Sequence, residues 1–440
     1  MGFKGVLAEL RYHPSAVIGL VIISLLLVMS IYAVIKIPYS EAVRLWRAGE
    51  VVWLENPRNA APKWYNWFGA GLPETIKIET SRAEKAEEAL GEGTRRVTYR
   101  LSFDFLYKRF PQELAIFFTP TYSKTPPQVV LSWRTPDGRE IPLGTRTLRG
   151  EERYVLSGDS NLLRRLGRAP EESLFADPAN PAQALRGRYE LVLEVYTFEP
   201  GADLSAKLIV YGRVYGWAGT DHLRRDLSIG LLWGAPVAVA FGFTAAVGIA
   251  LIQFILSGIG TWFGGVMDIF IDRLTELRMI LPLLPILILV GMLWSRSIWV
   301  ILATLLMFGC LGGQKNYRAM FLQAREAPYI EAAKAYGAGN FRIVFRYLLP
   351  RLIPVLIPGF VLAIPDYVFL EASLAVLGIG DPILPTWGKI INDAYSMGAQ
   401  FKGLYYWLLE PAGLLMITGL GFAMIGFTLD RIFNPRLRSL

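Results

Sequence analysis

The sequence predicts an α-helical membrane protein with six transmembrane helices, both chain ends in the cytoplasm, and a mainly β extracytoplasmic domain inserted between helices 1 and 2. Three observations lead to this fold class. Hydrophobic residues make up 53% of the 440 residues, and the mean hydropathy is +0.36. These values are too apolar for an ordinary soluble protein. Charge-free runs long enough to cross a bilayer alternate with short segments rich in Lys and Arg, whereas residues 37–218 contain no such run.

The composition also argues against several other classes of function. The net charge of +8 sits largely in short loops beside apolar runs, where membrane topology explains it better than nucleic-acid binding. Cys310 is the single cysteine, so no disulfide can form within the chain, and His13 and His222 show no zinc-ligand spacing. No phosphate-binding loop of the form G-x-x-x-x-G-K-[ST] occurs. We therefore expect no catalytic residue, metal site or cofactor in this chain.

The amino-terminal segment predicts two elements. Residues 1–13 carry apolar side chains at helical spacing, which indicates an amphipathic helix on the membrane surface or, equally, a frayed terminus. Residues 14–36 contain a charge-free run of spanning length and predict transmembrane helix 1. Lys4 and Arg11 precede this run, so its amino end is expected in the cytoplasm and the next segment outside.

Residues 37–218 predict a mainly β domain. Val97–Phe105 alternates apolar and polar side chains, and residues 189–198 and 208–216 are further strand candidates. Residues 128–133 and 139–144 flank Pro136-Asp137-Gly138 and predict a hairpin. Ser81 and Glu84 form a capping-box pattern, which predicts one helix over 81–90.

A tryptophan cluster in the same domain has two interpretations. Trp53, Trp64 and Trp67 lie close together in the sequence. They could serve as a binding platform, but such residues are more often part of a core or an anchor at the membrane interface.

The carboxyl-terminal half predicts five further spans. No charged residue occurs between Leu227 and Met267, which predicts a second helix over about 228–257 followed by a glycine-rich re-entrant or interfacial turn. The other expected spans are a tight hairpin at 279–295 and 297–314, a fifth helix at 352–380 and a sixth at 404–429.

Two acidic residues lie inside the predicted fifth span. Asp366 and Glu371 are costly in an apolar phase, so each must face a bundle interior or a watery path. Either they line a translocation pathway or they hold neighbouring helices together.

A basic loop, residues 315–350, separates the fourth and fifth spans and is expected in the cytoplasm. Pro328 is suited to a first helical turn, Gly337 and Gly339 are expected to end that helix, and Asn340 could cap a second. The sequence thus predicts a helix-turn-helix loop. Its basic residues are Lys315, Arg318, Arg325, Lys334, Arg342 and Arg346.

This loop resembles the cytoplasmic "EAA" loop of ABC-importer permeases. The family usually has a branched apolar residue three positions before the final proline, and here that position is Tyr347. By resemblance, the loop would couple the permease to ATPase subunits. The matching residues are Glu331, Ala332, Ala333, Gly337, Leu349 and Pro350.

A second set of residues resembles the G-T-D-x-x-G-R-D signature of C-type subunits in the oligopeptide/dipeptide/nickel class. Arg224 stands where this signature usually has glycine. The matching residues are Gly219, Thr220, Asp221, Arg225 and Asp226. Further similar stretches are Glu371-Ala372-Ser373-Leu374, Trp387-Gly388 and the tail Asn434-Pro435-Arg436-Leu437-Arg438, where the family usually begins with aspartate.

The resemblance covers roughly residues 219–438 and implies an assembly. A C-type subunit would have its permease core at 219–440, pair with a homologous B-type permease in a prokaryotic plasma membrane, and be surrounded by lipid. Two ATPase subunits would hydrolyse ATP, and an extracytoplasmic binding protein would deliver peptides, nickel complexes or oligosaccharides. Residues 37–226 would lie outside the cell.

Some alternatives remain open at this point. C-type subunits usually carry a much shorter segment than residues 37–218, so this insert is expected to dock the binding protein or to form a stabilising lid against the partner permease. Other classes compatible with an apolar chain are a secondary transporter, which usually shows two related halves, and a membrane-anchored receptor that uses the β domain.

Overall fold

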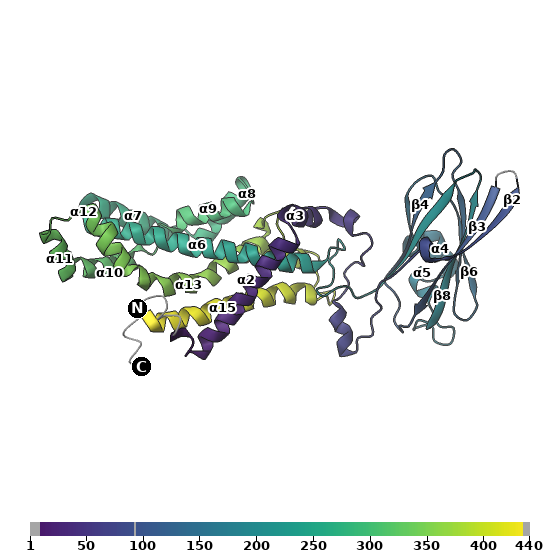
Figure 1. Ribbon diagram of the computed structural model, residues 1–440, viewed down its shortest axis with the longest axis horizontal. Coiled ribbons are helices and arrows are strands. Elements are labelled where there is room, and N and C mark those ends of the chain that lie inside the picture. Colours follow the sequence, from purple (N-terminus) through teal and green to yellow (C-terminus); the bar gives the residue numbers. More distant parts are fainter. Residues whose placement is uncertain (1–8, 92–93, 434–440) are drawn as a thin grey trace. The chain divides into compact units, whose positions relative to one another are not determined.

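The computed structural model describes residues 9–91 and 94–433, which form two compact units (Figure 1). Residues Ala48–Ser228 form a mainly β unit, and the segments on either side of it form a helical unit. These limits differ from the predicted limits of 37 and 218. Helix α3 (Tyr39–Arg47) accounts for the first difference, because its Ala42 is buried against Trp233 and Ala33 of the helical unit.

The β unit is a sandwich of two antiparallel sheets. Their strand orders are β1-β9-β4-β7 and β2-β3-β8-β5-β6, and side chains from both sheets share one core. The strands are β1 (Ile76–Glu79), β2 (Glu84–Gly91), β3 (Thr94–Phe105), β4 (Glu113–Thr121), β5 (Gln128–Arg134), β6 (Glu140–Thr147), β7 (Glu152–Val155), β8 (Gly187–Thr197) and β9 (Asp203–Tyr211). Two short helices, α4 (Ser160–Leu166) and α5 (Pro170–Ser173), connect β7 to β8.

An aromatic group fills the centre of this core. Phe103, Phe105, Trp133, Phe175 and Tyr189 are buried, and their ring centroids lie 4.6–6.3 Å apart. The indole N–H of Trp133 donates to the Leu174 carbonyl at 3.1 Å, so this polar atom is satisfied inside the core. A unit built without disulfides is therefore stabilised by large buried aromatic surfaces.

Most strand predictions are confirmed, but the helix predicted at 81–90 is wrong. Residues 97–105 lie in β3, where all five alternating apolar side chains are buried, and the predicted hairpin is β5–β6. The predicted helix is mostly the exposed edge strand β2, which pairs with β3. The unpaired backbone groups along β3 offer hydrogen bonds that a local capping pattern cannot supply.

The helical unit contains the membrane helices. Among the described residues, four helices are individually long and apolar enough to cross a membrane, or six spans exist if each of two bent pairs counts as one. The spanning helices are α2 (Pro14–Lys36), α6 (Leu227–Phe263), α15 (Tyr406–Phe433) and the 40-residue segment Asn340–Ile379, which includes α12 (Asn340–Arg342) and α13 (Leu349–Leu374). The bent pairs are α7 (Gly265–Ile280) with α8 (Leu283–Leu293), and α9 (Ile298–Gly309) with α10 (Gln314–Arg325). Helices α11 (Pro328–Ala335) and α14 (Trp387–Ser396) are shorter.

Two details of the predicted spans are wrong. Helix α6 does not end near residue 257 but continues for 37 residues, until Gly264 and Gly265 adopt positive φ angles. Gly258 lies inside this helix, where it allows a close approach: a Cβ atom there would lie 3.0 Å from Leu349. The predicted hairpin helices are only 11 and 12 residues long, so each reaches spanning length only with its bent neighbour.

Glycines let three helices approach one another near Trp387. The Trp387 side chain is buried and donates its indole N–H to the Leu231 carbonyl of α6 at 2.8 Å. A Cβ atom on Gly234 would lie 2.2 Å from this ring, and one on Gly388 would lie 2.6 Å from the Cα atom of Ala372. The Trp387-Gly388 pair therefore brings α14 against the backbones of α6 and α13.

We expect Gly388→Ala to destabilise the helical unit, because the added methyl group meets backbone atoms of α13 that cannot move independently. Such overpacking costs about 1–3 kcal/mol. The matched control is Gly413→Ala in α15, where an added Cβ meets nothing within 4 Å. Thermal unfolding of the purified protein in detergent measures both, and equal midpoints for the two variants would contradict the packing argument.

Candidate functional site

The 315–350 loop is a helix-turn-helix whose turn is closed by backbone hydrogen bonds. Helix α11 begins at Pro328, and Gly337 follows its carboxyl end with a φ of +77°. The Gly337 N–H donates to the Lys334 carbonyl at 2.9 Å, and the Ala338 N–H donates to the Ala333 carbonyl at 3.0 Å. This pair of bonds is a Schellman motif. Because an added Cβ at Gly337 meets nothing within 4 Å, glycine is required here for its backbone conformation.

The second arm begins one residue earlier than predicted. Gly339 occupies the capping position of α12, and Asn340 is the first helical residue. The side chain of Asn340 instead accepts a hydrogen bond from the Trp262 indole N–H at 3.3 Å. The prediction that Asn340 caps this helix is therefore wrong, and the side chain ties the turn to the end of α6.

The second arm of the loop and the fifth span form one helix. A π-helical stretch, Ile343–Leu348, joins α12 to α13, and a second one, Ala375–Ile379, follows α13. The whole segment runs for 40 residues from Asn340 to Ile379 (Figure 1). The sequence places the start of this span at residue 352, because the charges of Arg342 and Arg346 obscure the continuity.

Apolar and cation–π contacts hold the loop on the rest of the helical unit. Ile330, Ala333 and Val344 are buried in one cluster with Phe254 of α6 and Phe321 of α10. In addition, the Lys334 ammonium lies 5.2 Å from the Trp262 ring centroid, and the Arg351 guanidinium lies 4.6 Å from that of Tyr329. Helix α11 and the turn after it are thus fixed on their inner face by α6 and α10.

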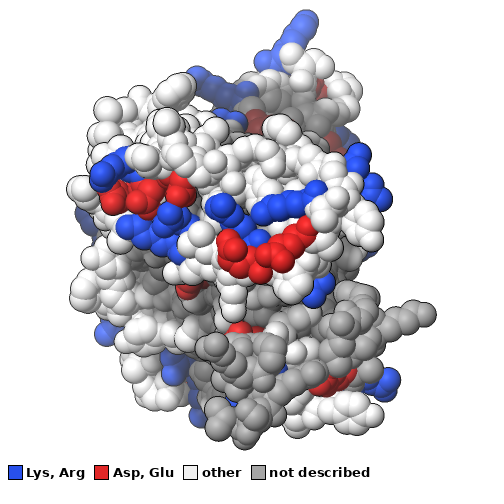
Figure 2. All heavy atoms as spheres, turned by 90° about the vertical axis from the view of Figure 1, so that its left-hand side faces the viewer, with Lys and Arg blue, Asp and Glu red and all other residues white. Residues whose placement is uncertain are grey.

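The outer face of the loop remains exposed. Glu331 and Ala332 are exposed, whereas Ala333 is buried. The first two residues of this motif are therefore available for contact with another protein, and the third packs inside this subunit. Tyr336 is 92% exposed and Phe341 is 70% exposed on either side of the Gly337 turn. The analysis of the sequence missed these two aromatic residues, although their position beside the glycine turn could have indicated them. Figure 2 looks onto this end of the molecule, where acidic and basic groups gather amid uncharged surface.

At the other end of the loop, Leu349 is buried in the same cluster as Ile330, whereas Pro350 is exposed. The residues that match the motif therefore divide into a buried set and an exposed set. Ala333 and Leu349 hold the loop in place, and Glu331, Ala332, Gly337 and Pro350 lie on its surface.

The signature residues 219–226 build a folded turn before α6. Gly219 has a φ of +72°, and its carbonyl accepts from the Leu227 N–H at 3.2 Å, which closes the turn. Thr220 is fully buried; its hydroxyl donates to the Pro57 carbonyl at 2.8 Å and accepts from the Ala60 N–H at 2.9 Å. This threonine therefore joins the turn to the start of the β unit.

A buried ion pair stiffens the same turn. Asp221 is fully buried, accepts from the Arg225 side chain at 2.5 Å, and also accepts from the backbone N–H groups of Leu223 and Arg225 at 2.9 Å. Asp226 accepts from the Ser228 N–H at 2.9 Å, and burial raises the pKa of Asp226. These residues fold the chain locally, and nothing in their contacts indicates catalysis.

Arg224 adopts a backbone conformation that glycine takes more easily than other residues. Its φ is +62°, a left-handed value that is unfavourable for an arginine. Its side chain is buried, with Nε 2.8 Å from Glu50 and Nη1 2.7 Å from the Asn56 carbonyl, while Nη2 pairs with Glu113 of β4. The guanidinium carbon also lies 4.7 Å from the Tyr211 ring centroid. The carboxylates of Glu50 and Glu113 thus balance the charge of the buried guanidinium, and a glycine at this position would carry no charge to balance.

The ion pairs lower the pKa of Glu50. Partial burial opposes its charge, but hydrogen bonds from Arg224 and Arg58 outweigh this and hold the pKa of Glu50 below its usual value of 4.5. The same contacts raise the pKa of Arg224. Glu50 and Arg224 are therefore both charged at neutral pH.

Asp366 and Glu371 do not share a site. They are five positions apart in the sequence, so they point about 140° apart around α13. Glu371 is 7% exposed and hydrogen-bonds the Thr386 side chain, whereas Asp366 is exposed. Next to Glu371, Asp381 accepts from the Ile298 N–H at 2.9 Å at the start of α9. Glu371 therefore lies in a polar packing contact between helices.

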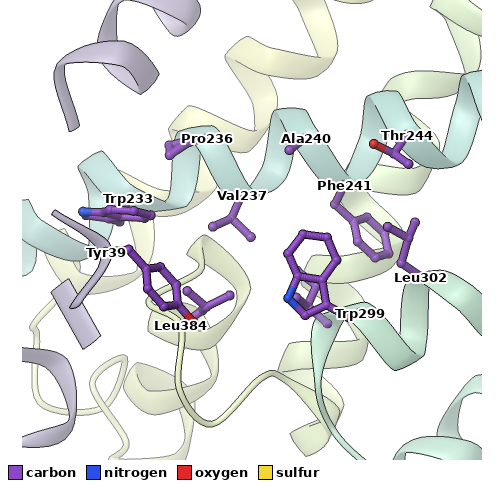
Figure 3. A pocket seen from close by; sticks show the side chains of 11 residues that line it. Tyr39, Trp233, Pro236, Val237, Ala240, Phe241, Thr244, Trp299, Leu302 and Leu384 are labelled. Carbon is purple, nitrogen blue, oxygen red and sulfur yellow. The ribbon is translucent and has the colours of Figure 1, made fainter. Parts of the chain in front are cut away.

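The remaining features of the helical unit offer little chemistry. A cavity of about 250 Å³ lies between Tyr39, Trp233, Phe241, Trp299 and Leu384, and its lining is apolar or aromatic apart from Thr244 (Figure 3). Across residues 9–91 and 94–433 no group of three or more His, Cys, Asp or Glu side chains is arranged to hold a metal ion.

Comparisons with known proteins place this chain among transport permeases. Residues 254–439 match the family described as binding-protein-dependent transport system inner membrane component. The dipeptide transport system permease protein DppC of Bacillus subtilis (strain 168) is 31% identical over 223 residues, which are 50% of this chain and 69% of that protein. The chain belongs to this family. It is an ABC-importer permease, and this membership argues against the secondary-transporter and receptor alternatives.

Two other relatives of this permease carry related names. The oligopeptide transport system permease protein OppC of Bacillus subtilis (strain 168) is 30% identical over 225 residues, 51% of this chain and 72% of the relative. The peptidoglycan transport system permease protein YejE of Agrobacterium fabrum is 32% identical over 222 residues, 50% of this chain and 57% of the relative. The family match begins after the β unit, which ends at Ser228. The predicted tail motif at 434–438 and most of the predicted helix at 1–13 lie outside the described residues.

We expect Arg224→Ala to destabilise the β unit, because Glu50 and Glu113 then lose their shared cation. Breaking a buried ion pair from one side costs about 3–5 kcal/mol. Arg224→Gly should cost about 1 kcal/mol less, since glycine relieves the left-handed backbone. Hydrogen exchange of peptides from residues 48–228 in the purified full chain measures both variants, with the exposed Arg188→Ala as control. A gain of protection in Arg224→Gly over the natural protein would refute this account.

The lowered pKa of Glu50 predicts a pH dependence. The stabilisation is present above the usual pKa of 4.5 and is lost as the pH falls through the lower folded-state value. Glu50→Gln should therefore reduce hydrogen-exchange protection around residues 49–58 at neutral pH, and its difference from the natural protein should disappear in acid. A difference that stays constant down to about pH 3 would show that the charge of Glu50 is not involved.

Proposed function

We propose that this permease is the C-type subunit of an ATP-driven, binding-protein-dependent importer for peptides or a similar solute such as oligosaccharides. The names of its relatives support this substrate class, since they are dipeptide, oligopeptide and peptidoglycan permeases. A homologous B-type permease would complete the pathway, two ATPase subunits would hydrolyse ATP, and an extracytoplasmic binding protein would deliver the solute.

The proposed topology has six spans and both chain ends in the cytoplasm. Counting each bent pair as one span gives six crossings, and Lys334, Arg342 and Arg346, which follow the second bent pair in the sequence, then face the cytoplasm as positive charges usually do. In this topology the β unit lies outside the cell. We propose that it docks the binding protein, because a domain outside the cell is on the side from which the binding protein delivers its solute.

The observation that carries the coupling proposal is the continuous helix from the 315–350 loop into the membrane. The exposed side chains of Glu331, Ala332 and Tyr336 would contact a groove of the ATPase, where the small Ala332 allows close approach. Closure of the ATPase pair on ATP would then move α11 and its turn together. Because α12 and α13 form one helix, the displacement would reach the pathway as a rigid-body motion.

The same arrangement suggests roles for the two acids of α13. Asp366 is exposed within a helix of spanning length, so in a membrane it needs water or a partner subunit beside it. We propose that it faces the B-type permease or the pathway. Glu371, with its Thr386 contact, serves helix packing.

We expect Glu331→Arg and Gly337→Pro to abolish transport and co-purification of the ATPase subunits while the protein still inserts into the membrane. The first variant reverses an exposed charge at the proposed interface. The second removes the Gly337 N–H that bonds Lys334 and forbids the positive φ. Co-expression with the ATPase subunits, followed by affinity purification and transport assays, measures both effects.

Gly337→Asn is the matched control, because asparagine adopts left-handed conformations readily and the site has room for a side chain. It should keep most of the transport activity. Full transport by Glu331→Arg and Gly337→Pro would reject the coupling role of the loop, and absence of any ATPase co-purifying with the natural protein would reject the importer assignment.

A further inference from the structure

The β unit exposes a group of aromatic side chains that its fold does not need. Phe68 is 81% exposed, Trp67 is 74% exposed and Trp217 is 72% exposed, and Trp64 lies partly buried beside them. We call these four residues the aromatic patch. Large aromatic side chains gathered on a surface indicate contact with something apolar, because each ring left in water forfeits its burial free energy.

The aromatic patch is held rigidly by the backbone around it. Residues Lys63–Phe68 form a 3₁₀ helix, and the Lys63 N–H donates to the Gly216 carbonyl at 3.0 Å. The Trp64 indole N–H donates to the Trp217 carbonyl at 3.0 Å, and the Trp67 and Trp217 rings meet edge to face with centroids 5.9 Å apart. These contacts fix the positions of the exposed rings relative to one another.

The position of the aromatic patch along the chain indicates what covers it. Trp217 lies two residues before Gly219, whose carbonyl is 3.2 Å from the N–H of Leu227. Leu227 is the first residue of α6, an apolar helix of spanning length. Since each residue extends the chain by at most about 3.6 Å, the Trp217 backbone lies within about 13 Å of the start of that helix. The aromatic patch therefore lies beside the point where the chain enters α6, and a spanning helix meets the lipid headgroups near its ends.

The charges beside the patch fit the same surroundings. A hollow of about 580 Å³ opens between Trp64, Trp67 and Trp217, and Lys63 and Glu74 border it as an exposed ion pair at 2.5 Å. A zwitterionic headgroup would meet both signs of charge next to the rings. Tryptophan itself favours this zone, because its ring is apolar and its indole N–H is polar.

We propose that the aromatic patch inserts into the interface of the adjacent membrane leaflet and anchors the base of the β unit to lipid. The inference rests on α6 being a membrane span and is independent of the substrate and of the ATPase partners. It also separates the tryptophans of the predicted cluster, because Trp64 and Trp67 belong to the patch, whereas Trp53 lies in a different 3₁₀ segment, Gly49–Trp53.

Site-specific fluorescence quenching in the full-length protein tests this anchor. Cys310→Ser removes the single cysteine, after which Phe68→Cys or Leu90→Cys carries a small fluorophore. Leu90 is a matched control because it is apolar, 50% exposed and lies at the opposite end of the same unit. Leu90 follows Ala89, which pairs with Arg95, and the Arg95 side chain donates to the Ala202 carbonyl just before β9. The aromatic patch includes Trp217, which lies beyond the other end of β9. Because the nine residues of β9 span about 30 Å, Leu90 is far from the patch.

The labelled proteins are placed in nanodiscs of zwitterionic lipid that contain a lipid with a nitroxide near its headgroup. We expect the label at 68 to lose most of its emission and the label at 90 to lose almost none. Adding Trp67→Ser and Trp217→Ser should restore the emission at 68, because the remaining rings no longer hold the patch in the interface. Hydrogen exchange of residues 94–211 checks that the unit stays folded in this variant.

Two outcomes would overturn the proposal. Equal quenching of the labels at 68 and 90 would mean that the patch does not touch lipid. The second outcome is a label at 68 whose emission is not quenched by the nitroxide lipid but changes when an oligosaccharide or a binding protein is added. This result would mean that the patch contacts a ligand or a protein instead of lipid.

Discussion

Backbone hydrogen bonding constrains the helix from Asn340 to Ile379 more than any single side chain does. An apolar phase offers no partner for an unpaired N–H or carbonyl, so a span must satisfy these groups itself. Pro354, Pro358 and Pro365 lie inside α13, and because proline has no N–H, each leaves a carbonyl one turn earlier without its usual donor. The π-helical stretch Ile343–Leu348 lies between α12 and α13 and carries the helix from the loop into the span without a break. The continuity that results makes the 315–350 loop and the span one mechanical element.

The motif residues separate into those that build the scaffold and those that remain available to other proteins. Thr220, Asp221 and Gly388 are buried and hold backbones together, which explains their presence without any contact to a solute. Glu331 and Ala332 have no comparable role in the fold of this subunit, because they lie on its surface. A motif match by itself does not distinguish these two kinds of residue, whereas burial does.

Features with a local cause could be predicted from the sequence. The alternation in β3, the turn between β5 and β6 and the end of α11 at Gly337 each depend on a few neighbouring residues. Features with a distant cause could not. Residues 84–91 form a strand because they pair with β3. Gly258 is approached closely by Leu349, which lies far from it in the chain. The environment of Arg224 depends on Glu50 and Glu113, which lie 174 and 111 positions away in the chain.

The arginine in the signature turn also bears on how the β unit could be removed from this permease. Glu50, Asn56 and Glu113 all belong to the β unit, and their contacts compensate the charge of Arg224. A minimal permease made by excising the segment that holds these three residues would retain an uncompensated guanidinium at the entry to α6. The excision therefore has to be accompanied by glycine at position 224, which carries no charge and adopts the positive φ without strain.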